Sequence, residues 1–166
     1  MILGMTTSTF TLVHVLLSLI GIGSGLVVTY GLLNSKRLDR WTAIFLATTV
    51  LTSVTGFGFP FDHLERSHKL GIISLLMLAI AIAARYAFRL AGAWRWIYVV
   101  SAMISLYLNV FVLIVQAFRK VPALKAMAPT QSEPPFLVAQ LVVLALFVVL
   151  TVLAAKKFRN EPISAV

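Results

Sequence analysis

Three histidines carry the most reactive side chains in this chain. His14, His63 and His68 each hold an imidazole, which can bind zinc, copper or a haem iron. Asp62 and Glu65 flank His63, and their carboxylates could complete a metal site. His63 and His68 are five residues apart, which is not the one-face spacing of a helical metal pair. We therefore consider a divalent metal held by these loop residues, or haem b held by His14 and His68. Anchoring of the loop histidines at the membrane interface is the simpler alternative.

Hydroxyl and amide side chains extend this set of candidates. Ser18 lies one helical turn after His14, and Asn109 and Gln116 are seven residues apart, so each pair shares a helix face. If the helices close around one another, these groups and the histidines converge on one outward-facing polar pocket for a metal ion, a haem or a quinone-like ring. The predicted lining residues are Ser18, Thr52, Ser53, Thr55, Asn109, Gln116, Gln131, Glu133 and Gln140.

The amino-acid composition predicts what kind of elements position these residues. Of 166 residues, 60% are hydrophobic and only 11% are charged, whereas a soluble domain carries about 25% charged residues. A water-soluble fold of this size cannot bury so much apolar surface. We therefore predict an all-α integral membrane protein. The absence of cysteine excludes disulfides, thiolate metal sites and cysteine nucleophiles.

Five apolar stretches are each about as long as a helix needs to cross the hydrocarbon core of a bilayer. They are separated by short polar loops, so we predict a single domain over residues 1–166, folded as a five-helix bundle. The loop after Lys120 is the longest, and residues 121–128 in it could form a short interfacial helix. The predicted spans cover residues of about 9–33, 41–59, 69–88, 96–118 and 135–155.

The basic residues predict the orientation, because Lys and Arg accumulate in cytoplasmic loops. With the N-terminus outside and the C-terminus in the cytoplasm, nine of the 14 basic residues lie on the cytoplasmic side and five on the outer side. The net charge of +9 is thereby explained by the membrane, without a nucleic-acid partner. The nine cytoplasmic residues are Lys36, Arg37, Arg40, Arg85, Arg89, Arg95, Lys156, Lys157 and Arg159.

Two other functional classes stay open. An oligomeric channel or transporter would need polar residues through the inner half of the spans. Few are present there: Thr29, Thr42, Ser101 and Thr151. No carboxylate lies near the middle of a span, which disfavours a proton- or sodium-driven transporter. A non-catalytic accessory subunit of a larger membrane complex, or a homo-oligomer, is the second alternative. Catalysis is poorly supported, because Ser18 beside His14 is the one pair of nucleophile and base.

Small and basic residues suggest two contact surfaces. Gly21 and Gly25 form a GxxxG motif, which lets helices approach closely, and packing within one monomer is its simplest interpretation. A basic and aromatic belt near the cytoplasmic side could hold anionic lipid headgroups or simply fix the depth of the helices. The belt comprises Arg85, Arg89, Trp94 and Arg95.

Two segments carry a resemblance to known proteins. The stretches NVFVLIVQAFRKVPALKAMAPTQSEPPF and FPFDHLERSHKLG resemble small polytopic inner-membrane proteins of bacteria, a group to which no activity is attached. The resemblance implies a bacterial inner-membrane location. It also marks Asn109, Gln116, Gln131, Glu133 and the pair His63/His68 as positions to test, and it implies no catalytic residue.

Overall fold

The computed structural model describes residues 2, 4–59 and 66–159. Their regular elements are helices, which confirms the all-α prediction. In chain order these are α1 (Thr7–Leu33), α2 (Asp39–Gly56), α3 (Arg66–Ile82), the π-helix η1 (Ala83–Ala87), α4 (Trp94–Lys120), α5 (Pro122–Met127) and α6 (Pro134–Lys157).

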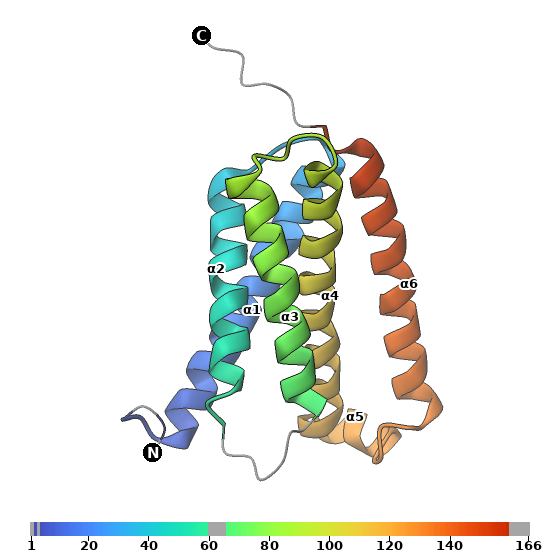
Figure 1. Ribbon diagram of the computed structural model, residues 1–166. Coiled ribbons are helices and arrows are strands. Elements are labelled where there is room, and N and C mark those ends of the chain that lie inside the picture. The colour runs from blue at the N-terminus through green and yellow to red at the C-terminus, as the bar shows by residue number, and fades with distance from the viewer. Residues whose placement is uncertain (1, 3, 60–65, 160–166) are drawn as a thin grey trace.

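Five long helices lie side by side, and each runs opposite to the one before it (Figure 1). The short helix α5 fills the turn between α4 and α6. The start of α1, the end of α2, the end of α4 and α5 therefore share one end of the bundle, which we call the N-terminal end. The end of α1, the start of α2, η1 and the end of α6 share the opposite end, which we call the C-terminal end.

Four of the helices are long and apolar enough to cross a membrane. They cover Thr7–Leu33, His68–Ala87, Trp94–Lys120 and Pro134–Lys157, and they support an integral membrane protein. The remaining long helix, α2, is more polar, because it starts with Asp39 and Arg40 and contains five threonines.

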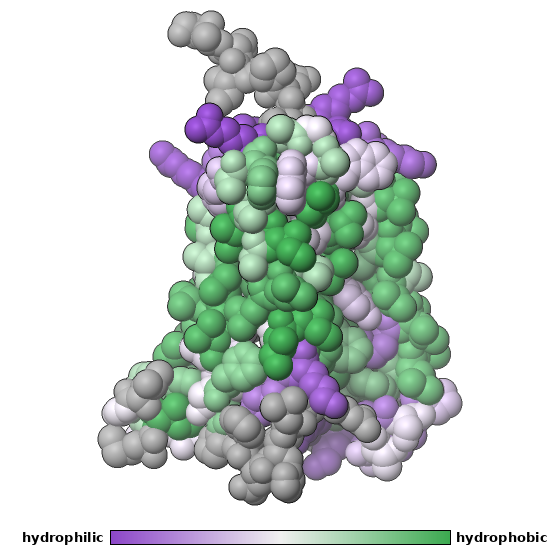
Figure 2. Space-filling view, in the orientation of Figure 1, coloured by the Kyte–Doolittle hydropathy of each residue, from purple (hydrophilic) through white to green (hydrophobic). Residues whose placement is uncertain are grey.

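The surface of the bundle matches this assignment. Figure 2 shows a broad hydrophobic band around the middle of the molecule, with hydrophilic residues gathered toward its two ends. Large apolar side chains are exposed along the band, and on α6 Leu141 and Val142 are 63% and 61% exposed. Such exposure is unfavourable in water and favourable in lipid, where there is no water to exclude.

Glycines of α1 allow close packing inside the monomer. A Cβ at Gly25 would lie 2.6 Å from Leu106 Cδ1 on α4 and 3.0 Å from the Phe45 ring on α2. A Cβ at Gly21 would lie 3.0 Å from Thr49 Oγ1 and 3.2 Å from Asn109 Nδ2. The GxxxG motif therefore lies in the contact of α1 with α2 and α4.

Candidate functional site

One face of α1 carries the polar residues at the N-terminal end of the bundle. His14, Ser18 and Gly21 follow at intervals of four and three residues, so they lie on one helix face. That face meets α2 at Thr49 and Thr55 and α4 at Asn109. We call these five polar residues the His14 cluster: His14, Ser18, Thr49, Thr55 and Asn109.

The hydrogen bond of His14 favours one tautomer of its ring. His14 Nδ1 lies 2.8 Å from Thr55 Oγ1. The Thr55 hydroxyl donates its proton to a carbonyl of its own helix, Leu51 O at 2.7 Å or Thr52 O at 3.2 Å. With that proton given to a carbonyl, the Thr55 hydroxyl accepts from His14, and the tautomer that fits this arrangement carries the proton of the neutral imidazole on Nδ1. His14 Nε2 is left with its lone pair, available to a donor or a metal.

Aromatic rings hold the other side of the imidazole. Phe59 meets the His14 ring edge to face, with centroids 5.2 Å apart and an interplanar angle of 88°. Phe59 also packs edge to face on Phe10 at 5.1 Å, and Phe10 is buried. The half-buried imidazole thus borders an apolar aromatic wall.

A second pair joins α1 to α4 one turn deeper. Ser18 Oγ donates to Asn109 Oδ1 at 2.7 Å, and Asn109 Nδ2 reaches Ser18 O at 3.5 Å. Among the described residues, the buried Thr49 Oγ1 has no hydrogen-bond partner. Thr49 was not among the predicted site residues, because a threonine in an apolar helix normally bonds its own backbone. Its proximity to Gly21 is a tertiary contact, which no signal in the sequence predicts.

Other predicted lining residues do not join this cluster. Thr52 and Ser53 donate to carbonyls of their own helix, at 2.8 and 2.9 Å, and Ser53 also donates to Ser74 Oγ at 3.1 Å. Gln140 Nε2 donates to Phe111 O at 3.3 Å, across the contact of α6 with α4. These groups join helices rather than line a common cavity, and Gln116 is half-buried on α4.

His68 lies on the first turns of α3, in a different environment from His14. Its side chain is buried and faces the Phe57 ring, with centroids 5.5 Å apart. Asp62, His63 and Glu65 lie outside the described residues. Within the described ranges, no three His, Cys, Asp or Glu side chains form a group that could hold a metal ion.

The turn before α6 has its own hydrogen-bond network. The Glu133 carboxylate accepts from Thr130 N at 3.1 Å, Thr130 Oγ1 at 2.7 Å and Ser132 N at 3.1 Å. The bond from the Thr130 hydroxyl, followed by these backbone bonds, lowers the pKa of Glu133 below its ordinary value. Gln131 turns inward and donates to Val115 O at 2.8 Å. Glu133 therefore stabilises its own turn.

The basic belt differs from the prediction at Arg85. Its side chain is 1% exposed and forms an ion pair with Asp39, whose side chain is 71% exposed. The guanidinium also lies 5.3 Å from the centroid of the Tyr98 ring. A buried, paired guanidinium does not reach lipid headgroups. Arg85 lies within the π-helix Ala83–Ala87, whose wider turn gives its residues a different angular position from that expected of a regular α-helix.

The other three members of the belt each have a different environment. Arg95 Nη1 donates to Phe158 O, so it ties α4 to the end of α6. Trp94 stacks on Phe88, with centroids 3.8 Å apart and planes at 3°. Arg89 is exposed and has φ of 50°. Arg89 therefore fits the predicted lipid contact better than Arg85 or Arg95.

Two features are thus built from side chains of several helices: the His14 cluster at the N-terminal end, and the Arg85–Asp39 pair at the C-terminal end. The former pairs a hydrogen-bonded imidazole with the buried Thr49 hydroxyl, which has no hydrogen-bond partner among the described residues. No protein-family model, curated protein or solved structure matches the chain.

Proposed function

We propose that the chain crosses a bacterial inner membrane five times, with its N-terminus outside, and that α2 is the fifth span. The antiparallel course of α2 between α1 and α3 supports this reading (Figure 1). A helix rich in threonine can cross if its hydroxyls bond to its own carbonyls, as those of Thr48, Thr52 and Thr55 do. The excess of Lys and Arg at the C-terminal end of the bundle supports the orientation.

We further propose that the protein binds a quinol-type ligand, an aromatic ring with a hydroxyl group, at His14. One observation carries this proposal: His14 Nδ1 lies 2.8 Å from the Thr55 hydroxyl, which also bonds a carbonyl of its own helix, and this arrangement favours a proton on Nδ1 and an accepting Nε2. The ring of the ligand would pack near Phe59 and Phe10 while its hydroxyl donates to Nε2. Because His14 is half-buried on a helix with lipid-facing neighbours, a membrane-dissolved ligand could reach it sideways.

This ligand fits the cluster better than a metal ion or haem b. Among the described residues, the His14 ring contacts Thr55 and Phe59 and no second imidazole, so these contacts support neither a metal ion nor haem b. An oligomeric channel is also less well supported by the structure. The hydroxyls of Ser24, Thr29 and Ser101 donate to carbonyls of their own helices instead of lining a polar path. An accessory role in a larger membrane complex is compatible with ligand binding.

Titration of the detergent-purified full chain with decylubiquinol and with decylubiquinone tests the proposal. The quinone has carbonyl oxygens and no hydroxyl, so it cannot donate to Nε2. We expect the quinol to bind at least about tenfold more tightly, the value of one good hydrogen bond. The ¹⁵N signal of His14 Nε2 should be that of an unprotonated nitrogen and should shift when the quinol binds.

Two threonine variants provide the matched comparison. Thr55→Val removes the acceptor for Nδ1 and frees the ring to change tautomer, so the preference for quinol over quinone should disappear. Thr52→Val removes a hydroxyl of the same helix that bonds only its own backbone, and the preference should be retained. Equal binding of quinol by the wild type and by His14→Ala would refute the site. A Soret band from stoichiometric haem in the purified protein would replace the quinol with haem.

A further inference from the structure

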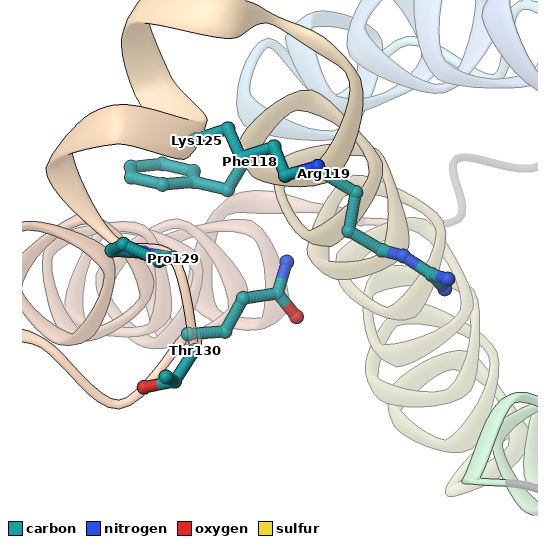
Figure 3. A pocket seen from close by; sticks show the side chains of 6 residues that line it. Phe118, Arg119, Lys125, Pro129 and Thr130 are labelled. Atoms are coloured by element: carbon teal, nitrogen blue, oxygen red, sulfur yellow. The ribbon is translucent and has the colours of Figure 1, made fainter.

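A cavity at the N-terminal end of the bundle lies apart from the His14 cluster. It has a volume of about 240 Å³ and lies where α4 ends, α5 passes and the turn to α6 begins. Pro129 and Thr130 border it on one side, and the long side chain of Arg119 lies on the other (Figure 3). The full lining is Phe118, Arg119, Lys125, Pro129, Thr130 and Gln131.

The walls of the cavity are held in place by buried contacts. Phe118 is 7% exposed and packs edge to face on Phe136 of α6, with centroids 5.4 Å apart. Ala128, between α5 and the turn, is fully buried in the same small cluster. The side chain of Gln131 bonds Val115 O on α4 at 2.8 Å and anchors the turn. The cavity is therefore a preformed feature of the fold.

Its charge is positive. Arg119 and Lys125 line it and are exposed, and Lys120 adjoins it in sequence. The nearby carboxylate, Glu133, accepts three hydrogen bonds from its own turn. The ion pairs found among the described residues join Asp39 to Arg37 and Arg85, at the opposite end of the bundle. Within the described part of the chain, neither Arg119 nor Lys125 forms an ion pair with a carboxylate, so the two cations favour an anion.

The position of the cavity points to a lipid. It opens where the apolar span α4 ends, at the level of headgroups if that span crosses the bilayer. Val121 and Met127 beside it are 43% and 54% exposed, as expected of a short helix that rests on acyl chains. Arg and Lys bind phosphate by charge-assisted hydrogen bonds, and the Thr130 hydroxyl could add another.

We propose that this cavity binds the phosphate-bearing headgroup of an anionic phospholipid through Arg119 and Lys125. The zwitterionic headgroup of phosphatidylcholine carries its own cation, which these two side chains would repel. The site is independent of His14, so either proposal can fail alone.

Binding of dihexanoylphosphatidylglycerol to the full chain in neutral detergent, measured by calorimetry, tests the proposal. The double variant Arg119→Gln/Lys125→Gln should bind it about 25-fold more weakly, since each basic residue contributes about fivefold. Lys156→Gln/Lys157→Gln removes two exposed basic residues at the opposite end of the bundle and should change the affinity less than about twofold. Equal thermal midpoints of both variants would show that the fold is intact.

Further measurements test both the identity of the ligand and the site itself. Dihexanoylphosphatidylcholine should bind clearly more weakly than the anionic lipid, and equal binding would refute the assignment. Inorganic phosphate at millimolar concentration should not displace the lipid. Displacement by phosphate that requires Arg119 and Lys125 would reassign the cavity to a soluble phosphate. An unchanged affinity of the double variant for phosphatidylglycerol would refute the site itself.

Discussion

At the scale of single residues, Arg85 illustrates how a charge is accommodated inside the bundle. Its guanidinium is almost fully buried, with Asp39 on one side and the Tyr98 ring on another. Asp39 is itself mostly exposed, so the pair keeps one member in water and its strength is partly screened. Burial of a charge without a partner is nevertheless costly.

We therefore expect Asp39→Asn to destabilise the protein by about 1–2 kcal/mol, because it leaves the buried guanidinium without its carboxylate. The measurement is the thermal midpoint in detergent, followed by circular dichroism. Arg40→Gln changes an exposed charge on the adjacent residue and should leave the midpoint nearly unchanged. Identical midpoints for the two variants would mean that the ion pair does not stabilise the fold.

At the scale of elements, the two faces of α1 differ in how much space they leave for a side chain. Gly25 faces the bundle, where a Cβ would meet Leu106 and Phe45 at 2.6 and 3.0 Å. Gly23, two residues earlier, is exposed, and a Cβ there would meet no atom within 4 Å. One face of α1 needs small residues because it packs against other helices, while the opposite face is exposed.

Gly25→Leu should therefore lower the stability by at least about 1–3 kcal/mol through overpacking. Gly23→Leu should be neutral or slightly stabilising, because leucine favours the helix over glycine by up to about 1 kcal/mol. Thermal unfolding of both variants in the same detergent gives the comparison. Equal losses would contradict the packing of α1 on α2 and α4.

At the scale of the whole molecule, the alternating helices place the start of α1 and the end of α6 at opposite ends of the bundle. With the proposed orientation, a reporter fused after Val166 should be active only in the cytoplasm. A reporter fused after Lys125 should be active only outside, because that position follows four spans. Extracytoplasmic activity after Val166 would reverse the orientation and move both proposed sites to the cytoplasmic side.

Local composition was enough to predict much of the fold and part of the site. Long apolar stretches bounded by charges predict helices in lipid, and the predicted span of about 96–118 became Trp94–Lys120. The interval of four residues between His14 and Ser18 predicts a shared helix face whatever the rest of the chain does. These features depend on neighbours in the chain, so the sequence by itself determined them.

Contacts between distant segments were decided by the tertiary structure. The partner of His14 is Thr55, 41 residues away, and that contact favours a proton on Nδ1. The helical period also gave no indication of the π-helix that accompanies the burial of Arg85, or that Gln131 would bond to α4 instead of joining His14. Such contacts depend on where helices cross and which small residues let them approach, and these are properties of the packed bundle as a whole.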